Sequence, residues 1–172
     1  MGCSVVLTGV TLDCRDNVGG IKTVHIMEVG GIGFTLEGGG SDFIDSVSGN
    51  QADVFELELR RESGSYVETI NNSLENSSLF FTQELTISIS KLDSVKRAAL
   101  KEIAKGRVQV IFTDANNTPW LIGYEYGAVM TGSAMTGTAL GDKSGYELVF
   151  TAKEKMPANA VSTAWYDDLT QE

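Results

Sequence analysis

The sequence contains few of the residues from which active sites are most often built. Its 172 residues include one histidine and two cysteines. Histidine is the commonest catalytic base and metal ligand, and structural zinc sites need four closely spaced nitrogen or sulfur ligands. Cys3 and Cys14 have no such spacing and are too few for a disulfide framework, and His25 lies in an alternating strand pattern. We therefore expect no catalytic residue, no metal site and no enzyme activity.

Motifs for phosphate and calcium are incomplete. The glycine run 38–40 is not followed by Lys-Ser or Lys-Thr, and Asp142 separates Gly141 from Lys143 in the other candidate loop. The run 114–117 begins like a calcium loop but lacks the central glycine and the distal glutamate. We expect no cofactor.

The chain is also short of positive charge and of long apolar runs. It has 23 acidic against 13 basic residues and a net charge of −10, which disfavours wrapping nucleic acid by neutralising phosphates. No apolar run approaches the roughly 18 residues of a membrane-spanning helix, and the N-terminus lacks a secretory pattern. We expect an acidic protein that is neither exported nor bound to a membrane, with both thiols reduced.

Two prolines against 19 glycines suggest many turns between short strands. Apolar and polar residues alternate, with the period of a half-buried strand, over 23–29, 54–61, 85–90, 108–112, 120–126 and 146–153. One segment has helical spacing instead, with Leu92, Val95, Ala99 and Ile103 along one side. The sequence predicts a mainly β fold: an antiparallel β-sandwich or barrel, flanked by one α-helix at about 93–105.

Length favours a single domain over 1–172, with an irregular lead-in at 1–20 and a C-terminal tail at 157–172. The segment at about 62–78 is polar, and we predict a long extended arm or loop there. Loops of this length inside a compact domain are usually disordered or functional. Its sparse apolar residues favour anchoring on a neighbouring molecule. The predicted contacts between subunits are Tyr66, Val67, Ile70, Leu74, Leu79 and Phe80.

The order of elements resembles structural proteins of tailed bacteriophages, particularly tail tube proteins. The resemblance lies mainly in residues 84–154. It covers a strand, a helix and a strand, then the hairpin around Trp120-Leu121-Ile122-Gly123-Tyr124, the turn Thr136-Gly137-Thr138-Ala139, and the strand Gly145-Tyr146-Glu147-Leu148-Val149-Phe150.

This resemblance implies a virion protein without enzyme activity. Its subunits would join edge to edge into rings, six to a ring in the family, and the rings would stack into a conduit for DNA ejection. The implied partners are other copies of the chain, other tail proteins, and DNA that passes without specific binding. Assembly would take place in the bacterial host cytoplasm.

Two alternatives remain open from the sequence. The chain could instead be a tail terminator or head-tail connector, which would form one ring without stacking. It could also be a monomeric β-sandwich that binds carbohydrate, with Trp120, Tyr124 and Tyr126 as a stacking surface.

Overall fold

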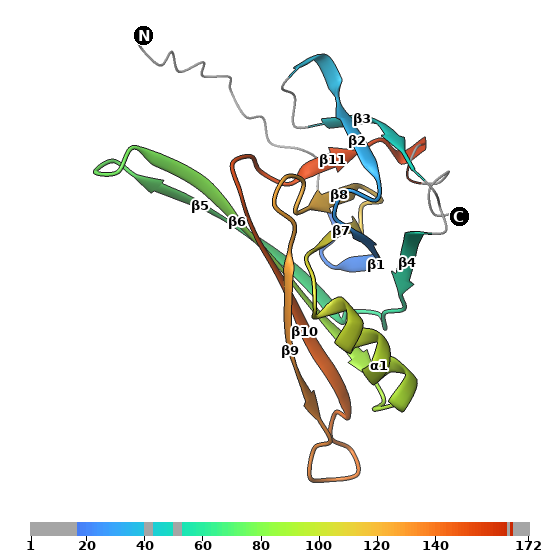
Figure 1. Cartoon of the computed structure of the whole chain (residues 1–172). Coiled ribbons are helices and arrows are strands. Elements are labelled where there is room, and N and C mark those ends of the chain that lie inside the picture. The colour runs from blue at the N-terminus through green and yellow to red at the C-terminus, as the bar shows by residue number, and fades with distance from the viewer. Residues whose placement is uncertain (1–16, 40–42, 50–52, 165, 167–172) are drawn as a thin grey trace.

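The computed structural model describes residues 17–39, 43–49, 53–164 and 166, and these form two packed β-sheets (Figure 1). Sheet A contains, in spatial order, β2 (Gly33–Leu36), β3 (Phe43–Ser48), β11 (Asn159–Val161), β8 (Pro119–Ile122), β7 (Val108–Asp114), β1 (Ile21–Glu28) and β4 (Val54–Leu57). Sheet B contains β5 (Gly64–Ser73), β6 (Ser78–Ser90), β10 (Gly145–Glu154) and β9 (Val129–Met135). A 3-10 turn, η1 (Glu37–Gly39), follows β2.

The sheets do not close into a barrel, so the sandwich is the confirmed form of the predicted fold. The described strand pairs are antiparallel except β3 with β11, which is parallel. The main core lies between the sheets, where the alternating pattern turns one apolar face of each sheet inward. Its fully buried side chains include Val24, Val110, Ile122, Leu85, Ile87 and Phe150.

A second, smaller core lies on the other face of sheet A. It contains Ile111, Leu121, Met27, Ile44, Val161 and Tyr166. Strand β7 is consequently buried on both faces from Val108 to Thr113. The predicted tail contributes to this core, because β11 inserts between β3 and β8 and Tyr166 is buried. Residues 165 and 167–172 of the tail, and 1–16 of the predicted lead-in, lie outside the described residues.

Helix α1 (Ser94–Ile103) confirms the helix predicted at about 93–105 and packs at one end of the sandwich (Figure 1). Asp93 occupies the N-cap position in extended conformation, although its side chain makes no capping hydrogen bond. Leu100 is buried, and Ile103 packs against the same core. Val95 is 72% exposed, which corrects its predicted place on the apolar side. Five residues turn a helix by about 140°, so Val95 points away from the core that Leu100 enters.

Two predicted strands are shorter in the structure. The strand predicted over 54–61 is β4, which ends at Leu57. Phe55 pairs with Ile26 and lies on the core-facing side of sheet A, as predicted, but it is 65% exposed. Strand β4 is the edge of sheet A and pairs only with β1 among the described residues, so fewer neighbours cover its side chains. The strand predicted over 120–126 ends at Ile122. There Gly123 has φ +75°, and a Cβ on it would lie 2.7 Å from the Ala128 nitrogen.

The predicted arm or loop at 62–78 is extended, as expected, but it is regular. Strands β5 and β6 form an antiparallel hairpin that pairs Gly64 with Ile87 at one end and Ser73 with Ser78 at the other. Its tyrosine, valine, threonine and isoleucine residues favour strands, while its asparagines and serines gave the segment the composition of a loop. The predicted extended segment is therefore a regular strand and its turn, because pairing with β6 orders it.

The hairpin is longer than the sheet that supports it. Strand β10 pairs with β6 only as far as Glu154, which lies opposite Phe81. Beyond that pair the hairpin has no third strand among the described residues, and it projects from the body in Figure 1. We call residues 70–81 the arm tip.

Candidate assembly surface

The arm tip carries apolar side chains that the body does not cover. Ile70 is 66% exposed, Leu79 is 55% exposed, and Leu74 in the turn between the strands is 91% exposed. The register pairs Ile70 with Phe81 and Asn72 with Leu79, on the same face as the Tyr66–Leu85 pair. At the base of the hairpin, around the Tyr66–Leu85 pair, this face is buried in the main core. The core-facing surface of sheet B thus continues past the core into solvent.

Tyr66, one of the six predicted contact residues, lies at the base of the hairpin. Its ring packs against Phe112, with 4.7 Å between ring centroids, and its hydroxyl donates to Glu68 Oε2 at 2.8 Å. Burial raises the pKa of Tyr66 well above its usual range, and the neighbouring Glu68 carboxylate raises it further. Tyr66 therefore helps to fix the hairpin to the body.

The other predicted contacts divide by exposure. Val67 is 59% exposed on the outer face of sheet B, and with Ile70, Leu74 and Leu79 it is free to meet a partner. Phe80 is half-buried, and Lys153 Nζ lies 6.0 Å from its ring centroid. Four of the six predicted residues are thus exposed on the hairpin, Val67 on its outer face, Ile70 and Leu79 on the opposite face and Leu74 in the turn.

Sheet B has an open edge on each side. Among the described residues β5 pairs only with β6, and β9 pairs only with β10. Edge strands expose backbone donors and acceptors, which attract a strand from another molecule unless they are protected. The exposed central residues of β9 are Thr131, Gly132, Ser133 and Ala134, so no charged or bulky side chain there blocks pairing with another strand. Nothing in the sequence indicates that this strand lies at an edge.

The outer face of sheet B is rich in hydroxyl groups. The register places on this face Ser65, Thr69, Thr82, Thr86, Ser88, Thr131, Ser133 and Thr151. Its charged residues within the four strands are Glu84, Glu147 and Lys153. This face therefore offers little positive charge to a polyanion.

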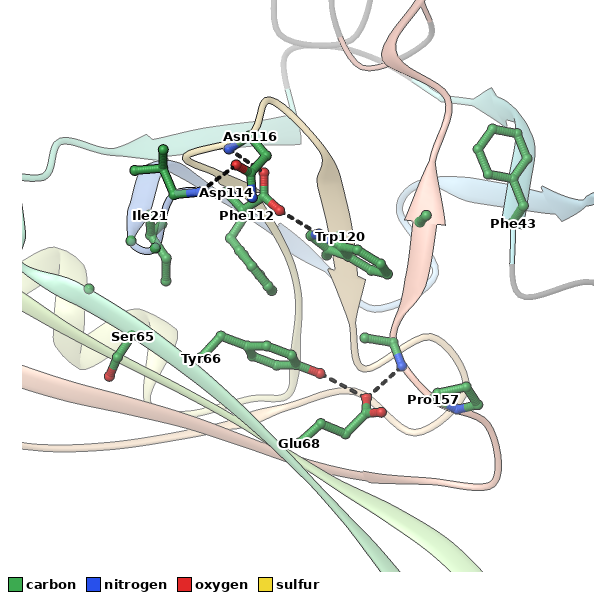
Figure 2. Close-up of a pocket in the computed structure, with 16 residues that line it drawn as sticks. Ile21, Phe43, Ser65, Tyr66, Glu68, Phe112, Asp114, Asn116, Trp120 and Pro157 are labelled. Carbon is green, nitrogen blue, oxygen red and sulfur yellow. Dashed lines mark hydrogen bonds between the residues drawn. The ribbon is translucent and has the colours of Figure 1, made fainter. Parts of the chain in front are cut away.

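A hollow lies between β5 and sheet A, where Tyr66 and Glu68 face Phe112 and Trp120 (Figure 2). Its volume is about 890 Å³, and most of its lining is apolar. Glu68 Oε2 accepts hydrogen bonds from the Tyr66 hydroxyl at 2.8 Å and from the Ala158 backbone nitrogen at 2.7 Å. The sequence pattern gave no indication of this pocket, because its walls come from segments far apart in the chain.

Asp114 lies at the other end of the pocket and closes the turn after β7. Its Oδ1 accepts from the backbone nitrogens of Asn116 and Thr118, each at 2.9 Å, and its Oδ2 accepts from Trp120 Nε1 at 3.3 Å. In the run 114–117, the Asp114 carboxylate thus stabilises the turn through these hydrogen bonds. No cluster of three histidine, cysteine, aspartate or glutamate residues suited to a metal occurs in the described part of the chain.

Comparisons with protein-family models, curated proteins and solved structures found no match to the chain. None of the helices within the described ranges is long and apolar enough to span a membrane.

The three aromatic residues considered for carbohydrate stacking do not share a surface. Trp120 packs against the main core, whereas Tyr124 packs against the second core on the opposite face of sheet A. Tyr126 is 40% exposed, with Lys155 Nζ 5.3 Å from its ring centroid. The shared face expected from the sequence is wrong, because the strand ends at Ile122 and the chain turns at Gly123.

Two buried polar side chains tie sheet B to the turn after β8. Gln83 Oε1 accepts from the Gly123 nitrogen at 3.1 Å, and Gln83 Nε2 donates to the Met156 carbonyl oxygen at 3.3 Å. Glu154, only 3% exposed, accepts from the backbone nitrogens of Tyr126 at 2.8 Å and Glu125 at 3.3 Å. Burial raises the pKa of Glu154, while these hydrogen bonds partly oppose the rise. Buried polar groups of this kind are stabilising only while they stay paired.

This raised pKa predicts a dependence of stability on pH. The folded protein keeps the Glu154 proton to a higher pH than the unfolded chain does, so ionisation of Glu154 disfavours the folded state. Its contribution to the free energy of unfolding should fall as the pH rises above the ordinary value of 4.5, by about 1.4 kcal/mol for each unit of pKa rise. Urea denaturation of wild type and E154Q from about pH 4 to pH 7 measures it. The stability advantage of wild type over E154Q should shrink as the pH rises, and a constant or growing difference would contradict the assignment.

Proposed function

We propose that the chain is a structural subunit that assembles with copies of itself, and specifically a tail tube subunit of a tailed bacteriophage. The observation that carries this proposal is the arm tip, a two-stranded ribbon with exposed Ile70, Leu74 and Leu79 and no third strand among the described residues. An isolated two-stranded ribbon is at best marginally stable in water. Contact with another copy would bury these side chains and support the ribbon.

Ring formation is favoured by the open edges of sheet B. Its two edges, β5 and β9, are different surfaces, so pairing of one with the other between copies is heterologous. Heterologous contacts close into a ring when the rotation between copies completes a circle. Backbone pairing of this type satisfies edge groups that a monomer leaves to water.

The outer face of sheet B suits the wall of a DNA conduit. In a ring made by edge pairing, this face becomes one continuous surface of hydroxyl groups, with Glu84, Glu147 and Lys153 as the charges from each copy. Protein contacts that hold DNA are made largely by lysine and arginine with phosphates. A surface with so little positive charge would let DNA slide without sticking.

Concentration-dependent assembly tests the proposed function. Light scattering coupled to size-exclusion chromatography should show species larger than the monomer as concentration rises, and negative-stain images should show rings and stacks of rings. Single rings that never stack would favour the terminator or connector alternative. Monomers at every concentration, with no rings in the images, would contradict self-assembly.

A further inference from the structure

The charges of the chain are separated along its sequence. Residues 91–107 carry six basic and two acidic residues, a net charge of +4, in a protein whose net charge is −10. Residues 62–90, which include the whole hairpin, carry four glutamates and no lysine or arginine. A basic helical segment therefore follows directly after an acidic hairpin.

A groove lies between α1 and the edge strand β9. Its volume is about 270 Å³, and its apolar lining includes Leu100, Met130 and Leu148. Arg97 and Lys101 also line it, both exposed, and neither forms an ion pair with the described residues. The groove thus combines an apolar floor with two unpaired cations.

The turn of the arm tip offers the matching features. Leu74 is 91% exposed, and Glu75 follows it in the same turn with no ion pair in the described part of the chain. An apolar side chain next to a carboxylate complements an apolar floor next to two cations. Opposite charges at an interface select the partner and its orientation more than they add affinity.

These two surfaces cannot meet within one molecule. Strand β6 runs from the arm tip to the segment that opens α1, and its 13 residues span about 40 Å at about 3.3 Å per residue. Figure 1 shows the turn of the hairpin and α1 at opposite ends of the molecule. Any contact between them is therefore made by two copies.

We propose that Leu74 and Glu75 of one copy dock in the groove between α1 and β9 of a second copy. Leu74 occupies the apolar floor, and the Glu75 carboxylate pairs with Arg97 and Lys101. This inference rests on the proposed function, and it names the surface that receives the arm tip. Because the donor and acceptor surfaces differ and lie far apart, the contact is heterologous, and it adds one layer to the next when the rotation between copies does not close a ring.

Charge reversal tests this docking. In wild type, stacking should weaken as salt increases, because exposed ion pairs are screened. R97E/K101E should raise the concentration needed for stacking by at least about tenfold, since it places like charges at the contact. E75K should do the same, and E75K combined with R97E/K101E should recover most of the loss. Lys105→Glu is the matched control, because Lys105 pairs with Glu102 on α1 itself and does not line the groove.

The outcomes separate this inference from the proposed function. If wild type stays monomeric, the proposed function fails. If wild type stacks and R97E/K101E stacks equally well, or if the combined variant recovers nothing, the docking site is overturned while self-assembly stands.

A photo-crosslinking residue in place of Leu74 gives a direct readout. In stacks of this otherwise unchanged chain the crosslink should join position 74 of one copy to peptides containing residues 97–104 or 130–134 of another. Crosslinks that map to other segments would overturn the proposed groove.

Discussion

Replacing Ile70 and Leu74 together by aspartate should abolish stacking and leave the fold of the subunit intact. Both side chains are exposed on the arm tip, at 66% and 91%, so the folded monomer loses little when they become polar. In a stack the same positions would be buried, and an unpaired buried carboxylate is costly. Circular dichroism should match wild type, and so should urea denaturation at concentrations where wild type is monomeric. Light scattering and negative-stain images should show no stacks.

Val95→Asp is the matched control for this double variant. Val95 is also an exposed apolar residue, at 72%, but it lies on the side of α1 that faces away from the core. The Val95→Asp protein should form stacks at the same concentration as wild type if the arm tip, rather than exposed apolar surface in general, makes the contact. An I70D/L74D protein that fails to fold would place the two residues in a core and refute the proposed role. Normal stacking of this variant would refute it as well.

The sequence was sufficient to predict features that depend on local periodicity. Alternation identified most strands, and the change to helical spacing identified α1 within two residues at each end. Each of these signals comes from neighbouring residues in the chain, so no knowledge of the partner strand is needed. This is also why the mainly β class with one helix was predictable.

Features set by distant pairing were not predictable from a single sequence. The regular pairing of the hairpin has no signal in the sequence, because Asn71, Asn72 and Ser73 resemble loop residues, yet β6 supplies their hydrogen-bonded partner strand. Periodicity says which residues share a face, but it does not say which strand lies at an edge. The pocket of Figure 2 and the groove beside Arg97 and Lys101 depend on the same missing information.

The predicted contact residues illustrate both cases. Ile70 and Leu74 were identified from their rarity in a polar segment, and both are exposed in the structure. Tyr66 shared that rarity but packs on Phe112, since the base of the hairpin lies over sheet A. Sequence alone cannot separate an apolar residue that anchors a hairpin from one that the hairpin presents to a partner.

The second prediction compares how much Phe150 and Phe55 each contribute to the free energy of unfolding. Phe150 on β10 is fully buried in the main core, opposite Leu85 of β6 and Met130 of β9. Phe55 on β4 is 65% exposed, although the alternating pattern gave both residues the same inward orientation. Phe150→Ala should lower the free energy of unfolding by about 3–5 kcal/mol, through lost burial and the cavity that remains. Phe55→Ala should lower it by less than about 1 kcal/mol.

Both variants are best measured in the I70D/L74D background, because self-assembly would make the apparent stability depend on protein concentration. Urea denaturation at neutral pH, with the midpoint and slope compared at two protein concentrations, gives the two free energies. A loss of several kcal/mol would be a large part of the roughly 5–15 kcal/mol that stabilises a typical domain, so Phe150→Ala should unfold at a much lower urea concentration. Equal losses for the two variants would mean that Phe55 is as buried as Phe150, and that sheet A continues as a packed layer at β4 instead of ending there as an open edge.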